Sequence, residues 1–416
     1  MNLWIYDEIW LLNSVKRVGA VLNNNLYLII RAKKYVENQE KGELLMGLVF
    51  RRTISDKIFI TALICAGLSF LIGTPRFTDI NWNTIGTLLS LMIGVQLLRT
   101  MHILDALSNW LLVKSQHTRQ MTQFFILLAF GGSMILTNDI AILTLVPTFM
   151  TINRHQKGAI AYPLTLIVMA ANLGSSFTPI GNPQNLFLVT SYHVNILMFF
   201  KLSTPLMIAS LILLVALSLW VPRKSLTMVP AKSITIHVSQ IGIATALIAF
   251  ITLGIFNLVP ISLVIIVTIV VGLTIDWHVF QHVDYALLLT FVCFFLFVSA
   301  ISHNFYITHW LNQLMQTPQS VYVAGLMTSQ AISNVPAAIL LANFTKYLPA
   351  LFLGVNIGGL GSIVASLANL LAVKQLLLFS KQQSLGHFLK VFTLLNLIGL
   401  LILGILGWLY LLMWAQ

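Results

Sequence analysis

Two short polar segments interrupt long apolar stretches of this chain, and they constrain its fold more than any other feature. They cover residues 172–185 (NLGSSFTPIGNPQN) and 356–369 (NIGGLGSIVASLAN). Each has Asn at both ends, Gly two residues after the first Asn, and a hydroxyl residue six residues after it. These residues are Asn172, Gly174, Thr178 and Asn185 in the first segment and Asn356, Gly358, Ser362 and Asn369 in the second. Broken helix at membrane depth is tolerated only where protein buries it or where it lines a cavity. Paired interruptions of this kind indicate the binding site of a transporter.

The composition excludes a soluble protein. The chain is 58% hydrophobic and only 8% charged, whereas a soluble chain carries about a quarter charged residues. The net charge of +12 does not indicate nucleic-acid binding, because most Lys and Arg residues lie between apolar stretches, as in the cytoplasmic loops of membrane proteins. We therefore predict an all-α polytopic membrane protein whose partner is the lipid bilayer, with no nucleic acid bound.

The N-terminal region and the first transmembrane half are predicted from these apolar stretches. Residues 1–57 form a cytoplasmic extension; two interpretations stay open for it, an interfacial amphipathic helix or a segment upstream of a true translation start at Met46. Residues 58–220 form the first half, with a hairpin at 122–152 and a broken helix at 160–190. Each arm of the hairpin is too short to span a bilayer. One continuous helix is the alternative, but basic residues on both sides of this region look cytoplasmic and favour a re-entrant hairpin.

The second half repeats this order after a cytoplasmic linker at 221–239. It covers residues 240–416, with a hairpin at 318–345 and a broken helix at 349–373. Tracing the loops by the positive-inside rule gives about nine crossings and hairpins that enter from opposite sides. The sequence therefore predicts an inverted repeat with two re-entrant hairpins and two interrupted transmembrane helices.

Uncharged polar residues at the hairpin tips and breaks are the predicted substrate-binding residues. Helix N-termini there offer N–H donors and partial positive charge to an anion, and unwound carbonyls suit Na⁺ or a protonated group. An Asn side chain supplies both a donor and an acceptor. For any single Asn, a packing or capping role is the alternative. The candidates are Thr137, Asn138, Asn172, Thr178, Asn185, Ser333, Asn334, Asn356, Ser362 and Asn369.

Asp139 is the predicted ion-coupling residue, because it is the one acidic residue that lies in a motif and ionisable groups at membrane depth are usually functional. Its alternative role is to cap the second helix of the hairpin. Cys65 and Cys293 lie in apolar stretches, and no Cys or His residues have metal-ligand spacing. We expect no metal and no cofactor. No catalytic set of residues is present, so we do not expect an enzyme.

Four motifs together resemble the ion transporter superfamily, and within it the anion permeases grouped with arsenite efflux pumps and citrate or dicarboxylate carriers. The motifs are TNDIAILTLVP at 137–147, the segment at 172–185, SQAISNVPAAILL at 329–341 and NIGGLGSIVASLANL at 356–370. The pattern is similar to a branch of bacterial inner-membrane permeases. The resemblance implies a scaffold domain and a transport domain, frequent homodimers, elevator-type alternating access and a place in the bacterial cytoplasmic membrane.

The resemblance also implicates particular tip residues. In sodium-coupled dicarboxylate relatives, Ser-Asn-Thr at both hairpin tips contacts the substrate carboxylates. The first two positions correspond here to Thr137 and Asn138 and to Ser333 and Asn334. The third position is Asp139 in one half and Val335 in the other, so the chain departs from that pattern. The departure favours a solute that is smaller or less charged than a dicarboxylate.

The function expected from these observations is secondary active transport of a small anion, coupled to H⁺ or Na⁺ and operating by an elevator mechanism. Two alternatives share the fold: a Na⁺/H⁺ antiporter, and an arsenite efflux permease. A membrane receptor or scaffold that does not transport is the alternative from a different class.

Overall fold

The computed structural model describes residues 51, 53–153, 160–225, 238–379 and 385–414. The chain divides into a unit of residues 1–57, nearly all of which lie outside the described residues, and a unit of residues 58–416 that carries the architecture. The described residues form helices and no strand, with one isolated β-bridge between His117 and Ser225. The predicted all-helical fold class is confirmed to this extent.

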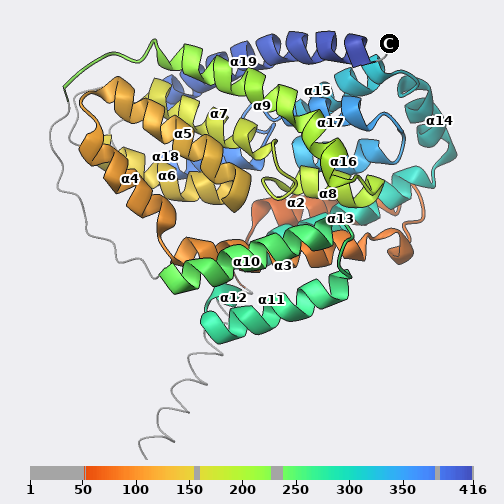
Figure 1. Ribbon diagram of the computed structural model, residues 1–416. Coiled ribbons are helices and arrows are strands. Elements are labelled where there is room, and N and C mark those ends of the chain that lie inside the picture. The colour runs from red at the N-terminus through yellow and green to blue at the C-terminus, as the bar shows by residue number, and fades with distance from the viewer. Residues whose placement is uncertain (1–50, 52, 154–159, 226–237, 380–384, 415–416) are drawn as a thin grey trace, which may run out of the picture. The chain divides into compact units, whose positions relative to one another are not determined.

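The first half contains eight α-helices and one 3₁₀ helix within the described residues (Figure 1). They are α2 (Lys57–Ser69), η1 (Phe77–Asp79), α3 (Trp82–Thr100), α4 (Ile103–Lys114), α5 (Thr118–Leu136), α6 (Asn138–Asn153), α7 (Ala161–Ser175), α8 (Pro183–Tyr192) and α9 (Ile196–Ser218). Helices α5 and α6 meet at Thr137, and the break between α7 and α8 falls within the polar segment that starts at Asn172.

The second half contains ten α-helices within the described residues. They are α10 (Val238–Ile255), α11 (Ile261–Ile275), α12 (Val279–His282), α13 (Tyr285–Ser302), α14 (Phe305–Leu314), α15 (Pro318–Ile332), α16 (Asn334–Ala342), α17 (Leu348–Ile357), α18 (Leu367–Phe379) and α19 (Leu385–Trp414). Helices α15 and α16 meet at Ser333, as α5 and α6 do at Thr137. Helices α17 and α18 are separated by the second polar segment.

Two short helices, α4 and α14, lie outside the hairpins and broken helices that the sequence predicts. Each precedes the first helix of a pair, α4 before α5 and α14 before α15. On α14 the aromatic residues Phe305, Tyr306 and Trp310 are exposed, while Leu311 is buried. Such short amphipathic helices do not produce the continuous apolar stretch by which spans are found.

The helix starts follow from capping residues in the sequence. Asn182 caps α8 by accepting the N–H of Asn185, and Pro183 occupies the first turn. Thr317 and Ser320 form a reciprocal capping box at the start of α15, and Pro318 occupies the first turn. Side-chain oxygens at these positions satisfy N–H groups that have no helical partner. Buried helix ends can therefore be placed inside the protein without unpaired donors.

Three described helices are long and apolar enough to cross a membrane: Ile196–Ser218, Tyr285–Ser302 and Leu385–Met413. Further apolar helices are shorter, including α7, α11 and α17. Broken and paired short helices are expected in a transporter. The helical content supports a polytopic membrane protein, and the number of crossings stays a prediction.

The helices form two packed groups (Figure 1). In one group, α10, α11, α12 and α13 pack against α3. In the other, α5 packs on α7, α15 packs on α17, and α19 lies against α7, α9 and α17. The contact between α5 and α7 is close at Gly174, where an added Cβ would lie 2.2 Å from the carbonyl oxygen of Phe130. Contacts of α3 with α8 and of α13 with α16 join the two groups.

Candidate functional site

The two helix breaks bring the predicted Asn residues together in the protein interior. All six are buried, with exposed fractions between 0% and 6%. A buried amide must find hydrogen-bond partners, because an unpaired one costs about 1 to 3 kcal/mol. The six residues are Asn138, Asn172, Asn185, Asn334, Asn356 and Asn369.

The breaks are hydrogen-bonded to each other crosswise. Asn172 Nδ2 donates to Asn369 Oδ1 over 2.7 Å. Asn356 Nδ2 donates to Asn185 Oδ1 over 2.8 Å. The first Asn of each break thus pairs with the last Asn of the other. This arrangement explains why both segments begin and end with Asn.

A second crosswise pair involves residues that the sequence analysis missed. Asn182 Nδ2 donates to Asn356 Oδ1 over 3.1 Å, and Ser366 Oγ donates to Asn172 Oδ1 over 3.0 Å. Asn182 and Ser366 each lie ten residues after the first Asn of their break. The signal that would have revealed them is a polar side chain at the same position in both segments, although the residue type differs.

The last Asn of each break also satisfies carbonyls of its own unwound segment. Asn185 Nδ2 donates to the carbonyls of Ser176 at 3.0 Å and Thr178 at 3.1 Å. Asn369 Nδ2 donates to the carbonyls of Gly359 and Ser362, both at 3.1 Å. Each break therefore keeps its shape through its own amide side chains, as the loss of helical hydrogen bonds requires.

The two helix junctions share an uncommon backbone conformation. Thr137 has φ 70° and ψ 153°, and Ser333 has φ 75° and ψ 153°. Glycine is almost the only residue that adopts this region without strain, and strain of about 1 to 3 kcal/mol at such positions is typical of ligand-binding sites. Because a hydroxyl residue and not glycine occupies both junctions, we interpret the hydroxyl group as a candidate for binding.

Both junctions dock on a break through the same hydrogen bond. The N–H of Asn138 donates to the carbonyl of Gly181 over 3.0 Å, and the N–H of Asn334 donates to the carbonyl of Ala365 over 2.9 Å. Gly181 and Ala365 each lie nine residues after the first Asn of their break. The first junction adds a side-chain bond, from Asn138 Nδ2 to Asn172 Oδ1 over 3.2 Å.

The hydroxyl groups of Thr178 and Ser362 bond to the helix that precedes each junction. Thr178 Oγ1 donates to the carbonyl of Met134 over 2.5 Å. Ser362 Oγ donates to the carbonyl of Gln330 over 3.4 Å. These hydroxyls therefore hold the breaks to the helix pairs, and a direct contact with substrate stays a prediction for both.

Asp139 lies in the first turn of α6 and is half-buried. Its own N–H is accepted by Asn138 Oδ1 at 3.0 Å, so Asn138 supplies a side-chain acceptor at this helix end. Among the described residues, the Asp139 carboxylate forms no hydrogen bond or ion pair. Both roles of Asp139, ion coupling and capping of α6, stay predictions.

No group of three or more His, Cys, Asp or Glu side chains that could hold a metal ion occurs among the described residues. Cys293 is buried and Cys65 is half-buried, and neither is disulfide-bonded. The chemistry of the site is that of neutral amides, hydroxyls, backbone groups and one carboxylate.

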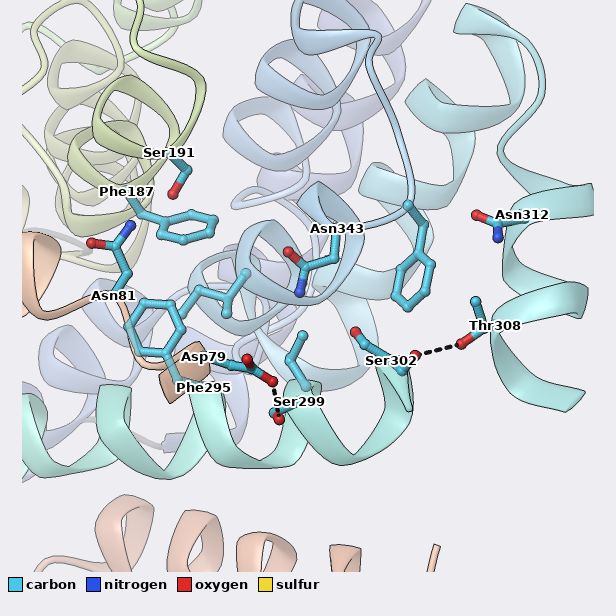
Figure 2. Close-up of a pocket in the computed structure, with 13 residues that line it drawn as sticks. Asp79, Asn81, Phe187, Ser191, Phe295, Ser299, Ser302, Thr308, Asn312 and Asn343 are labelled. Atoms are coloured by element: carbon cyan, nitrogen blue, oxygen red, sulfur yellow. Dashed lines mark hydrogen bonds between the residues drawn. The ribbon is translucent and has the colours of Figure 1, made fainter. Parts of the chain in front are cut away.

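A separate cavity of about 550 Å³ lies beside α8 and α16 (Figure 2). Phe187 and Ser191 of α8, Asn343 after α16 and Ser299 of α13 are among the residues that line it, and none of the predicted site residues does. The hydroxyl groups of Ser191 and Ser302 are buried there without a hydrogen-bond partner in the described part of the chain. No sequence motif predicted this cavity.

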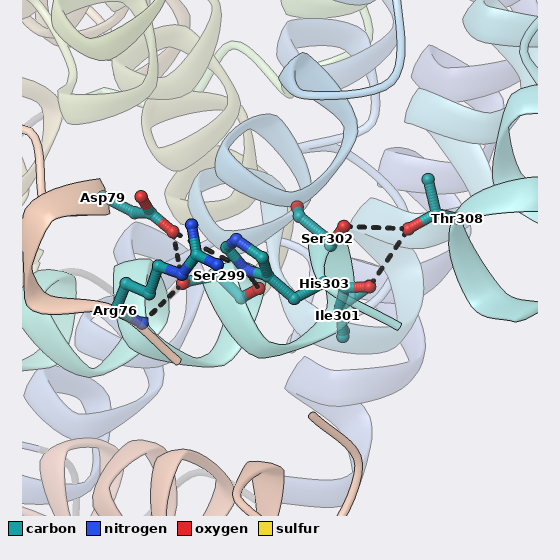
Figure 3. Close-up of polar contacts among 7 residues, drawn as sticks. All are labelled: Arg76, Asp79, Ser299, Ile301, Ser302, His303 and Thr308. Atoms are coloured by element: carbon teal, nitrogen blue, oxygen red, sulfur yellow. Dashed lines mark hydrogen bonds and ion pairs between the residues drawn. The ribbon is translucent and has the colours of Figure 1, made fainter. Parts of the chain in front are cut away.

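One wall of the cavity is fixed by a polar cluster around Ser299 (Figure 3). Ser299 Oγ donates to Asp79 Oδ2 over 2.5 Å and accepts the N–H of Arg76 at 2.9 Å. His303 Nδ1 lies 3.7 Å from the same carboxylate oxygen. This cluster ties η1 to the end of α13.

Comparisons with known proteins show which family the chain resembles. The model of the citrate transporter family (CitMHS) matches residues 46–347. The uncharacterized transporter MJ0456 of Methanocaldococcus jannaschii is 30% identical over 331 residues, which cover 79% of this chain and 89% of that protein. The inner membrane protein YbiR of Escherichia coli is 29% identical over 346 residues, covering 79% of this chain and 90% of YbiR. The crystal structure of the Alcanivorax borkumensis YdaH transporter aligns with a TM-score of 0.55 at 13% identity, covering 85% of this chain and 96% of that one.

Proposed function

Since the chain belongs to the citrate transporter family, it is a transporter and not an enzyme, and we propose that it carries a small anion across the bacterial cytoplasmic membrane. The transport is coupled to H⁺ or Na⁺. The two helix pairs, α5–α6 and α15–α16, are the re-entrant hairpins of an inverted repeat, and their tips hold the solute.

The observation that carries this proposal is the matched docking of the two tips. Both tip residues, Thr137 and Ser333, have the same strained backbone conformation, and the next residue in each case donates its N–H to the carbonyl nine residues into a break. The same hydrogen bond at two positions far apart in the sequence is unusual for ordinary helix packing. It is expected where two structural repeats build one binding site between them.

The proposed solute is an anion because the breaks and tips present helix N-termini. The start of α6 and the start of α16 follow the tips, and the start of α8 follows the first break. N–H groups and the helix dipole favour negative charge at these points. None of the ten predicted substrate-binding residues is Lys or Arg, which favours a solute smaller or less charged than citrate.

The two packed helix groups suit an elevator mechanism. We assign α3 and α10–α13 to the scaffold, and the hairpins with the broken helices to the moving domain. Because α3 contacts α8 and α13 contacts α16, the movement would occur along these contacts. In the proposal the scaffold also supplies the interface of a homodimer.

Na⁺/H⁺ antiport is the second candidate, and the carboxylate of Asp139 favours it. This group has no hydrogen bond or ion pair among the described residues, and a carboxylate at a helix tip can bind either H⁺ or Na⁺. Arsenite efflux is a further candidate within the fold, because a site of neutral amides and hydroxyls suits an uncharged solute.

The test uses purified protein in proteoliposomes. Charge movement and internal pH are recorded with and without Na⁺ while citrate, succinate, sulfate, phosphate and arsenite are applied. A response to one solute is expected, and it should be lost in Asn334→Ala. Asn83→Ala, an exposed position on α3, is the matched control and should transport normally.

Each other result has a defined meaning. Solute movement that survives Asn334→Ala contradicts the proposed site. A Na⁺-evoked pH change without any solute response moves the assignment to antiport. Folded protein that moves neither solute nor ions contradicts transport and favours the receptor or scaffold alternative.

A further inference from the structure

Gln330 makes contacts in the second half that have no counterpart in the first half. It lies four residues before Asn334 on α15, half-buried against the second break. Its Nε2 donates to the carbonyls of Gly358 at 2.7 Å and Leu360 at 2.9 Å. The residue four positions before Asn138 is Met134, which has no amide to donate.

The same side chain also accepts a hydrogen bond from the break. Gln330 Oε1 accepts the N–H of Ser362 at 2.9 Å. Gly361 has φ 100°, and a Cβ there would lie 2.4 Å from Gln330 Oε1. A residue with a side chain at position 361 would therefore be strained and would displace the amide. Gly361 and Gln330 fit each other as a pair.

The position of the Gln330 nitrogen is one that suits a cation. Unwound carbonyls in a broken transmembrane helix are the groups that coordinate Na⁺ in transporters. The nitrogen of a side-chain amide is a donor that carries partial positive charge and accepts no hydrogen bond. Gln330 Nε2 lies against two such carbonyls, those of Gly358 and Leu360.

We infer that Gln330 is a positioning residue that fills a site for a monovalent cation in the second break. The amide closes the break without a bound ion, and removal of the amide opens a carbonyl site that Na⁺ can occupy. This part of the inference does not depend on transport.

A second consequence rests on the proposed function. If the second break is closed by Gln330, ion coupling falls to the first half. There the carbonyl of Ser176, which corresponds to Leu360, already accepts Asn185 Nδ2 at 3.0 Å. The carboxylate of Asp139 is then the group that remains for the coupling ion, whereas the second half has Val335 at that position.

The test is a thermal unfolding experiment with Na⁺ as the probe. Purified wild type and Gln330→Ala are unfolded in detergent with NaCl or with choline chloride at equal ionic strength. We expect Gln330→Ala to unfold at a lower temperature in choline and to recover by about 3 °C or more in saturating Na⁺, beyond any shift in wild type, because a ligand that binds only the folded state stabilises it. The same difference should persist in an Asp139→Asn background.

Two further variants make the result specific. Gln330→Lys places an ammonium group near the carbonyls, so it should be stable in choline and gain nothing from Na⁺. Gln123→Ala removes a hydrogen bond of 3.0 Å to Ser218 away from the breaks, and it should lose stability without Na⁺ recovery. If Gln330→Ala is too unstable to purify, Gln330→Met is measured in its place.

The inference is overturned if Na⁺ stabilises wild type and Gln330→Ala equally, or if neither variant of Gln330 that removes the amide responds to Na⁺. Failure of the proposed function is seen separately, as an absence of solute movement in proteoliposomes. In that case, a Na⁺ response confined to the Gln330 variants that remove the amide would still support the cation site.

Discussion

The two halves of the proposed site dock their tips through the same backbone hydrogen bond, but side chains of different chemistry occupy several corresponding positions. Each half has a strained hydroxyl residue at its tip, an Asn that docks on a break, and a break that begins and ends with Asn. Differences in chemistry between the halves include Met134 and Gln330, Asp139 and Val335, and Asn182 and Ser366.

The difference separates two kinds of role. The Asn residues at the ends of the breaks hold the breaks together, because their amides are buried and bonded across the halves. The differing residues change the charge and the donors near each tip. The first half presents the Asp139 carboxylate, and the second presents the neutral amide of Gln330 and the apolar Val335. The two halves of the proposed site therefore differ in charge and in hydrogen-bond donors.

The largest expected effect comes from breaking the shared crosswise pairs. Asn172→Ala removes the donor to Asn369 Oδ1 and the acceptor of Asn138 Nδ2. The free energy of unfolding should fall by about 2 to 4 kcal/mol, because buried polar groups lose their partners. Asn356→Ala should have a similar effect, and both should abolish transport in proteoliposomes. Chemical or thermal unfolding in detergent measures the stability.

The comparison between the halves predicts that the two variants lower the free energy of unfolding by similar amounts. If Asn172→Ala were strongly destabilised and Asn356→Ala were near wild type, the halves would not share one framework. Asn83→Ala serves as the control for an exposed Asn and should change the free energy of unfolding by less than about 0.5 kcal/mol.

The next effect concerns the residue that differs most between the tips. Asp139→Asn should lower ion-coupled transport at least about tenfold, which corresponds to about 1.4 kcal/mol. It should not lower stability, because the carboxylate is half-buried and has no hydrogen bond among the described residues that the substitution would break. The pH dependence of transport should also disappear. Proteoliposome uptake measured over a range of pH values tests both statements.

Val335→Asn is the matched change in the second tip. It introduces the same side chain at the corresponding position without removing a carboxylate, so transport should keep its pH dependence. Loss of the pH dependence in Val335→Asn but not in Asp139→Asn would reverse the roles that we assign to the halves.

Much of the framework could be predicted from the sequence because helix breaks in an apolar chain have a clear signature. The spacing of Asn172 and Asn185 and its repetition at Asn356 and Asn369 identified both breaks. Gly, Pro and Asn interrupt helices for local reasons, and such signals can be read without knowledge of the tertiary structure. The apolar composition predicted the all-helical class, and composition too is known without the tertiary structure.

The contacts between the halves could not be predicted, because they depend on tertiary structure. Asn182 and Ser366 occupy corresponding positions, yet they differ in residue type and each bonds to the opposite half. Gln330 has the sequence context of an ordinary helical residue, and only the folded chain places its amide against Gly358 and Leu360. The cavity near Asp79 and Ser299 likewise forms from segments about 220 residues apart, whose proximity no local pattern reveals.

The smallest effect tests whether the tips store strain in both halves. Thr137 and Ser333 adopt a backbone conformation that glycine tolerates far better. Replacement by glycine should relieve about 1 to 3 kcal/mol of strain, offset in part by the greater entropy that glycine loses on folding, about 0.5 to 1 kcal/mol. Thr137→Gly and Ser333→Gly should therefore each stabilise the protein by about 1 kcal/mol, while transport falls because the tip hydroxyl is lost. Thr148→Gly, within helix α6, is the control and should destabilise by about 0.5 kcal/mol, since glycine is a poorer helix former than threonine. If all three variants were destabilised alike, the tips would not be strained, and their hydroxyl residues would need another explanation.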